Sequence, residues 1–105
     1  MFARNVALRL RPNALIQFRQ IVEKEVLPIL RKQAGFQDEI IFANPGPDVI
    51  AISLWDTKEH AEAYNTAAYP EVLKSLNSVL DGSPKVQFGD VICSTLPKDA
   101  AVAAA

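Results

Sequence analysis

The segment from Ile50 to Trp55 constrains the fold most, because a largely apolar strand leads directly into a predicted helix. Alternate side chains of a strand point to opposite faces. One face of this strand carries large residues and the other carries small ones that end in Trp55; the large ones are Ile50, Ile52 and Leu54, and the small ones are Ala51 and Ser53. A strand without a polar face is typical of a sheet covered on both sides. The sequence therefore predicts such a sheet, with room for a ligand beside the small residues.

Composition predicts one small domain that buries an additional surface. The chain has 105 residues, of which 50% are apolar and 22% charged. We expect a single domain over 1–96 and a C-terminal tail over 97–105. The net charge of -1 and the mixed distribution of charges provide no basic stripe for a phosphate backbone. Nucleic acid is therefore not an expected partner.

Cysteine and histidine usage bears on the compartment and on metal binding. Cys93 is the only cysteine and His60 the only histidine. No disulfide can form within the chain, and these two residues fall short of the three or four ligands of a zinc site. The apolar runs are shorter than the ~20 residues of a membrane span, and the N-terminus lacks a signal-peptide core. We expect a cytoplasmic protein with no metal, no cofactor and no membrane partner.

Hydrophobic periodicity predicts the first half of the domain. Residues 2–10 alternate as a strand, with Arg4 on the same side as Phe2 and Val6. Asn13 is expected to cap a helix that runs to about residue 32, and Pro28 is expected to kink it. Gly35 ends the helix. Residues 36–43 and 49–55 then form two strands of an antiparallel hairpin around a Pro- and Gly-rich loop.

The second half repeats the strand and helix pattern. Asp56 and Glu59 match an acidic capping box at the start of a helix over 57–67. Pro70 starts a second helical piece that reaches about residue 80, and residues 85–95 form the last strand.

The resulting order, β-α-β-β-α-β, is that of an α+β ferredoxin-like fold. In this arrangement a four-stranded antiparallel sheet carries its helices on one face. The other face would remain substantially apolar, and a second copy packed sheet to sheet is the simplest way to cover it. We therefore expect a homodimer through the sheet face.

Several short motifs resemble the antibiotic biosynthesis monooxygenase family of the dimeric α/β-barrel superfamily. The resemblance covers residues 2–95 and rests on Asn5, Gly35-Phe36, the junction over 54–57, Tyr64 and the closing run over 86–95. It implies a cavity between sheet and helices that, in characterised relatives, serves cofactor-independent oxygenation of aromatic, quinol-like or haem substrates. It also implies catalytic roles for a strand-one Asn, matched by Asn5, and for a helical aromatic residue, matched by Tyr64. The later His of the haem-degrading branch falls near Lys74.

The residues themselves support two interpretations each. Asn5, interpreted as sharing the small-residue face with Ser53, can donate to a substrate carbonyl or simply bond to a neighbouring backbone group. Trp55 can stack on a flat substrate as a third catalytic-site residue, or it can belong to the core. Tyr64 and Tyr69 can offer a phenol to a substrate oxygen, or they can pack against the sheet.

Two charged or titratable residues complete the candidates for substrate binding. His60 is the natural general base by its pKa, although its polar neighbours are typical of a solvated helix face. Arg9 can bind an acidic group at the cavity mouth or remain a surface charge.

Three functions stay open at this point. The first is a small cofactor-independent monooxygenase that acts on a planar aromatic or quinol-like molecule. The second is a non-catalytic or stress-related dimer that holds a small apolar or aromatic ligand. The third is a structural module whose cavity is filled by side chains.

Overall fold

A computed structural model describes residues 1–96 and contains one four-stranded antiparallel sheet. Its strands are β1 (Phe2–Arg9), β2 (Phe36–Ala43), β3 (Asp48–Trp55) and β4 (Lys85–Asp90), in the spatial order β2-β3-β1-β4. This arrangement confirms the predicted β-α-β-β-α-β order and the α+β class. The prediction that the last strand reaches residue 95 is wrong. Asp90 pairs with Phe2, the first residue of β1. Beyond it the Val91 N–H bonds to the carbonyl of Met1, the first residue of the sequence, at 3.0 Å.

The first helical segment is continuous but changes its hydrogen-bond register. It consists of α1 (Leu15–Ile21), the π-helical turn η1 (Val22–Val26) and α2 (Leu27–Arg31). The backbone N–H of Leu27 bonds to the Val22 carbonyl, five residues back. This wider turn lies directly before Pro28, which has no N–H to donate in a regular helix. The irregularity predicted around Pro28 therefore takes the form of a π-helix.

Two predicted helix starts are corrected by one residue each. Asn13 adopts a left-handed conformation with φ 59°, so Ala14 occupies the cap of α1 without a side-chain bond. Thr57, and not Asp56, caps α3 (Lys58–Ala67), because its hydroxyl accepts the backbone N–H of His60 at 3.2 Å. The last helix, α4 (Tyr69–Leu76), ends four residues before the predicted boundary. The predicted tail over 97–105 lies outside the described residues.

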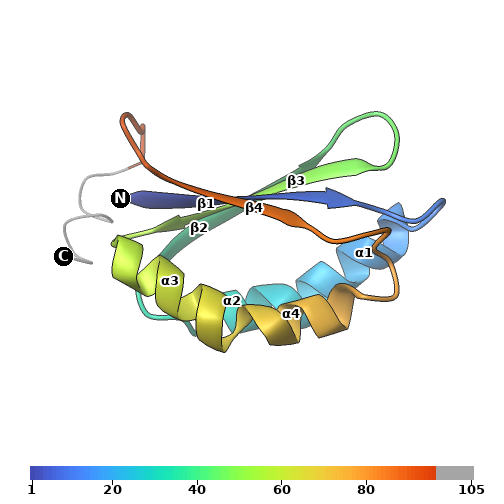
Figure 1. The fold of residues 1–105 in the computed structure, drawn as a ribbon, viewed down its shortest axis with the longest axis horizontal. Helices are drawn as coiled ribbons and strands as arrows, with labels where there is room; N and C mark the ends of the chain where they lie inside the picture. Colours follow the sequence, from blue (N-terminus) through green and yellow to red (C-terminus); the bar gives the residue numbers. More distant parts are fainter. Residues whose placement is uncertain (97–105) are drawn as a thin grey trace.

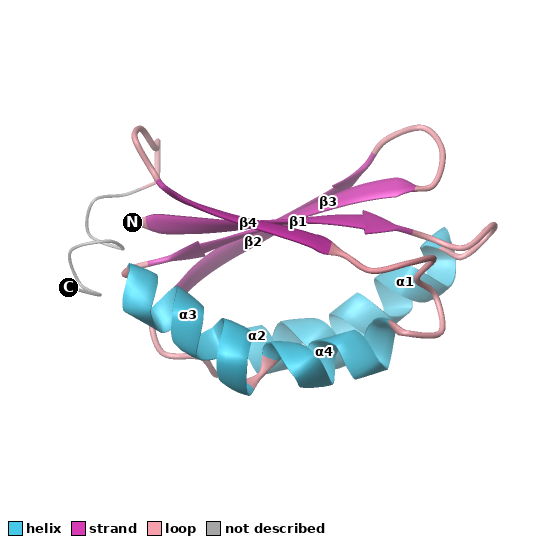
Figure 2. Cartoon of the chain, viewed as in Figure 1, coloured by secondary structure: helices cyan, strands magenta, loops and turns pink. Residues whose placement is uncertain are grey.

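The described helices cover one face of the sheet, as the two-layer arrangement in Figures 1 and 2 shows. On β1 the even-numbered residues Phe2 to Leu8 are buried under these helices, and on β3 the odd-numbered residues Val49, Ser53 and Trp55 are buried with them. The predicted parity of both strands is confirmed. The small residues of β3 therefore face the helices, and the hydrophobic core lies between the two layers.

The opposite sheet face, here called the open face, has none of the described helices over it (Figure 1). It carries the large side chains of β3 together with two exposed residues of β2, Ile40 (51% exposed) and Phe42 (46%). Asn5 pairs directly with Ile52 and so belongs to the open face. The interpretation that Asn5 shares a face with Ser53 is wrong, because Ser53 pairs with Arg4. Within residues 1–96, no helix is long and apolar enough to cross a membrane.

Candidate functional site

A row of three polar residues crosses the helix-covered face of the sheet. Ser53 on the central strand β3 pairs with Arg4 of β1 on one side and with Glu39 of β2 on the other. Directly paired residues of an antiparallel sheet point to the same face, so the three side chains stand side by side. The neighbouring rows on this face are apolar, and they comprise Phe2, Trp55 and Phe36 on one side and Val6, Ala51 and Ile41 on the other.

Arg4 places a positive charge inside the domain. Its side chain is 3% exposed, and Nη2 and Nε donate to Oδ1 of Asn65 in α3 at 2.8 and 3.1 Å. The guanidinium carbon lies 3.9 Å from the ring centre of Tyr69, a cation–π contact. Within residues 1–96, no carboxylate forms an ion pair with it. A buried cation with a neutral partner set is suited to meeting an anionic or strongly polar ligand atom.

Tyr69 provides a second polar group at the same place. Its hydroxyl is buried and has no hydrogen-bond partner among the described residues. Buried hydroxyls nearly always have such a partner, so this oxygen is available to a ligand. Tyr64 lies beside it at a ring separation of 6.1 Å. Burial raises the pKa of Tyr64, an effect that Arg4 opposes and that Glu39 and Tyr69 reinforce, so its phenol stays protonated.

Glu39 is a partly buried carboxyl at the other end of the polar row. Burial raises its pKa from 4.5 to about 8, the positive charge of Arg4 opposes this shift, and neighbouring Asp38 adds to it. The carboxyl therefore changes its protonation state in the pH range where many enzymes work, as proton-transfer groups do.

These groups surround a cavity between the sheet and the helices. The inner cavity measures about 40 Å³ and is lined by Arg4, Glu39, Ser53, Tyr64 and Tyr69 together with apolar side chains of η1 and α4. A groove of about 310 Å³ lies beside it between β2 and the first helical segment. Both spaces share the lining residues Phe18, Val22, Glu39 and Ile41. The groove has the size of a small-molecule site, and the inner cavity adds its polar end.

Trp55 lies one layer behind this cavity. It is fully buried, stacks on Tyr64 at 5.1 Å and meets Phe36 edge to face at 5.6 Å. Its indole N–H donates to the Ser53 hydroxyl at 2.8 Å. Trp55 is therefore core and does not line the cavity, and the Ser53 hydroxyl already has a partner. The two residues fix the position of the Tyr64 ring.

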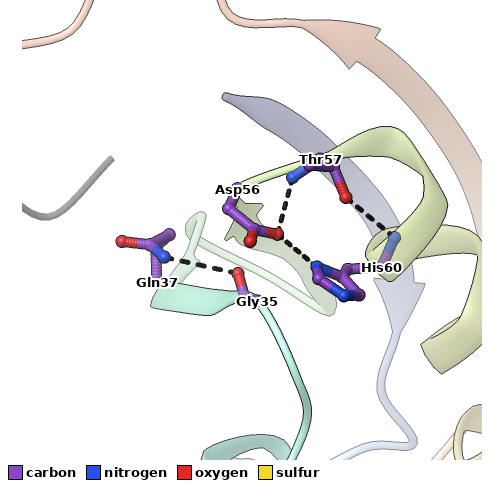
Figure 3. Close-up of polar contacts among 5 residues, drawn as sticks. All are labelled: Gly35, Gln37, Asp56, Thr57 and His60. Atoms are coloured by element: carbon purple, nitrogen blue, oxygen red, sulfur yellow. Dashed lines mark hydrogen bonds and ion pairs between the residues drawn. The ribbon is translucent and has the colours of Figure 1, made fainter. Parts of the chain in front are cut away.

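His60 belongs to a separate cluster at the start of α3, which Figure 3 shows. Its Nδ1 lies 2.6 Å from Oδ1 of Asp56, and the same oxygen accepts the backbone N–H of Thr57 at 2.7 Å. Gly35 packs against this pair so closely that a side chain at position 35 would collide with Asp56 and His60. The cluster packs the start of α3 against Gly35, which follows the first helical segment. His60 does not line the inner cavity.

The remaining candidates also lie outside the cavity. Arg9 is exposed and lines a surface depression at the far end of β1, and Asn5 lies on the open face. Sequence reasoning missed Arg4, Glu39 and Asn65 as site residues. A signal for Arg4 was present, since it is a charge at a core position of the alternating pattern of β1. Glu39 and Asn65 have no comparable local signal, because only the packing of β2 and α3 brings them to Arg4.

Comparison with known proteins places this arrangement among solved folds. No protein-family model and no curated protein matches the chain. A monooxygenase from the gene ActVA-Orf6 of Streptomyces coelicolor, solved with the ligand nanaomycin D, is 22% identical with a TM-score of 0.75 over 91% of both chains. SnoaB, a cofactor-independent oxygenase from Streptomyces nogalater, has a TM-score of 0.73 at 8% identity over 91% of this chain and 97% of its own.

A third solved structure carries the family name. It is a protein from Bordetella bronchiseptica proposed to be an antibiotic biosynthesis monooxygenase, 12% identical, with a TM-score of 0.75 over 88% of this chain and 97% of its own. This chain has the antibiotic biosynthesis monooxygenase fold. The resemblance inferred from short motifs is thereby confirmed for the fold. Because a fold does not by itself imply an activity, the polar row and the groove beside β2 are the features from which a function is argued.

Proposed function

We propose that the protein is a cofactor-independent monooxygenase that oxidises a planar aromatic or quinol-like molecule in the cavity between sheet and helices. The observation that carries the proposal is the unpartnered Tyr69 hydroxyl beside the buried Arg4 guanidinium. Two donors that line one small cavity suit an oxygen atom that becomes negatively charged during a reaction. The solved oxygenases with this fold support the reaction class.

The shape of the site favours a flat ligand. The groove of about 310 Å³ is lined mainly by apolar side chains and accommodates the body of the molecule. Its polar edge then reaches the inner cavity, where Tyr64 offers a ring face and a protonated phenol. In this pose the substrate oxygen meets Arg4 and Tyr69.

The chemistry needs an acidic substrate that supplies its own electrons. Ionisation of a phenolic ring system gives an electron-rich anion that reduces O₂, and the two resulting radicals combine into a hydroperoxide. For an acidic CH₂ group, loss of water from this hydroperoxide leaves a carbonyl. One O₂ is consumed, with one oxygen atom in the product and one in water. Arg4 and Tyr69 would stabilise the anion that starts the sequence.

The test uses 1,8-dihydroxyanthrone, a planar molecule with phenolic oxygens and an acidic CH₂ group. We expect the protein to accelerate O₂ uptake above the spontaneous rate and to incorporate one atom of ¹⁸O₂ into the product. Arg4→Met and Tyr69→Phe should each lower kcat/KM by roughly 100-fold, the usual cost of losing one oxyanion donor. Arg31→Met, at an exposed site at the end of α2, is the matched control.

The same assay separates catalysis from ligand binding. Trp55 is the only tryptophan and stacks on Tyr64, so its fluorescence reports occupation of the cavity. A fluorescence change on addition of the anthrone without accelerated O₂ uptake would contradict the oxygenase proposal for this substrate class. It would favour the non-catalytic ligand-binding protein instead.

We also propose that two copies pack through their open faces into a dimeric barrel. The large apolar side chains of this face, with Ile40 and Phe42 at roughly half exposure, form a surface that water contacts unfavourably. A sheet-to-sheet contact would remove it from water. Asn5 would then lie within the interface between the two copies and not in the cavity. Its catalytic role therefore stays a prediction that is independent of the cavity residues.

A further inference from the structure

The two ends of the polar row, Arg4 and Glu39, lie on different strands and can act on different parts of one ligand. Arg4 and Glu39 occupy strands on either side of β3, so their Cα atoms are about 10 Å apart at the usual strand spacing. Ser53 stands between them with a short side chain that is turned to Trp55. The two charged groups therefore line one cavity without forming an ion pair. A hydroxyl group at the edge of a flat ring held in the groove can therefore approach a proton acceptor and an oxyanion partner that line the same inner cavity.

Glu39 also stands at the passage into the cavity. It lines both the outer groove and the inner cavity, whereas Arg4, Tyr64 and Tyr69 line the inner cavity alone. A molecule that enters from the groove therefore meets the carboxyl before it meets the guanidinium. In this order of contacts, the ligand can transfer a proton to the carboxyl first and then bind as an anion beside the guanidinium.

We propose that Glu39 is the general base of the site, removing the proton of the substrate's hydroxyl group while Arg4 and Tyr69 receive the resulting oxyanion. This assignment rests on the proposed function and names the group that starts it. The proton passes from the ligand oxygen to a carboxylate oxygen of Glu39, which becomes neutral. No net charge enters the cavity during the transfer.

The charged and titratable surroundings of Glu39 agree with this role. Arg4 faces it across β3, Asp38 precedes it on β2, and Tyr64 and Tyr69 face it from α3 and α4. Arg19 and Glu23 line the groove from the first helical segment and form an exposed ion pair with each other. Among the described residues, Glu39 is the only carboxylate that lines the inner cavity.

Proton counting on ligand binding tests the proposal without any oxygen chemistry. The probe is 4-nitrophenol, titrated by calorimetry in buffers of different ionisation enthalpy at about pH 9, where the free phenol and Glu39 are both largely ionised. When the phenolate binds beside the carboxylate, the unmodified protein should take up about one proton per ligand. Glu39→Gln should bind the phenolate with no proton uptake. Glu25→Gln, at an exposed position on η1, should behave like the unmodified protein.

Equal proton uptake by the unmodified protein and Glu39→Gln, or no binding of 4-nitrophenol by the unmodified protein, would overturn the assignment. A kinetic readout separates this failure from failure of the oxygenase proposal. If the anthrone is oxidised, Glu39→Gln should lower kcat/KM about 100-fold and abolish its rise with pH. Glu39→Asp should restore part of that rise. Oxidation that is unaffected by Glu39→Gln would refute the base while leaving the monooxygenase intact.

Discussion

Glu39 and Arg4 stand in one row across the helix-covered face of the sheet, with Ser53 between them. Neither charge is paired with the other, although both line the same cavity. Each is held in place by other means, Arg4 by Asn65 and the Tyr69 ring, and Glu39 by the register of β2. The folded chain thus keeps a buried cation and a carboxyl of raised pKa unpaired in its interior. Such an arrangement costs stability and is typical of a functional site.

The pH dependence of stability should reveal the carboxyl of Glu39. Its pKa is 4.5 in the unfolded chain and about 8 in the folded one. Between these values the unfolded state releases a proton that the folded state keeps, so the free energy of unfolding falls as pH rises. The expected slope is about 1.4 kcal/mol per pH unit between the two pKa values. Glu39→Gln should lack this slope, so its free energy of unfolding should fall by roughly a few kcal/mol less over this pH range. Urea unfolding between about pH 4.5 and 8 measures it, and parallel curves for the two proteins would contradict the raised pKa.

Asn65 should matter for stability through Arg4. Asn65→Ala leaves two buried guanidinium N–H groups without their acceptor, Oδ1 of Asn65. We expect a loss of roughly 1–3 kcal/mol in the free energy of unfolding, the usual cost of an unsatisfied buried donor. Asn77→Ala, at an exposed site after α4, is the matched control and should change little. Equal effects of the two variants would argue that Asn65 does not hold the guanidinium.

Ser53 should matter through Trp55. Ser53→Ala removes the acceptor of the buried indole N–H and should cost roughly 1–3 kcal/mol. Denaturant unfolding followed by the emission of Trp55 measures this cost, and Ser78→Ala at an exposed position provides the baseline. A loss no larger than that baseline would show that the indole finds another partner.

The tight packing at Gly35 gives a prediction with an internal control. Gly35 and Gly82 both have positive φ values, 79° and 86°, so alanine strains the backbone at either site by roughly 1–2 kcal/mol. Only at Gly35 does the added methyl group collide with Asp56 and His60. Gly35→Ala should therefore lower Tm clearly more than Gly82→Ala. Thermal unfolding by circular dichroism compares them, and similar Tm values would show that the contact is easily relieved.

The open face should control the oligomeric state. Ile52 pairs with Asn5 and Ile40 near the middle of this face. Ile52→Glu would place a charge in the proposed sheet-to-sheet contact and should convert a dimer into a monomer in sedimentation equilibrium. Ile16→Glu, on a helical residue that is 76% exposed, should leave the dimer intact. An unmodified protein that stays monomeric at high concentration would disprove the proposed dimer.

Much of the fold follows from local patterns in the sequence. The alternation of Phe2, Arg4 and Val6 along β1 and the contrast of large and small residues along β3 predict which side chains of each strand share a face. These patterns repeat every two residues within one strand and need no knowledge of distant segments. The order of strands and helices was predictable for the same reason, and the errors at Asn13, Asp56 and the end of β4 concern single boundaries.

The candidate site was predictable only in part. Tyr64, Tyr69 and Ser53 line the inner cavity, and their roles toward a substrate stay predictions. Trp55 packs behind the cavity, and His60 belongs to the cluster at the start of α3. Asn5 was wrongly grouped with Ser53, because matching the faces of β1 and β3 needed the register between the two strands.

The sequence alone determined the α+β class, the two-sided character of the central strands and the aromatic residues available to the cavity. Only the tertiary structure decided that Arg4, Ser53 and Glu39 form one row and that Tyr69 stacks on the guanidinium. The physical reason is that a period along one strand specifies the face of each residue but not its neighbour across strands. That neighbour depends on register, which the packing of the whole domain sets.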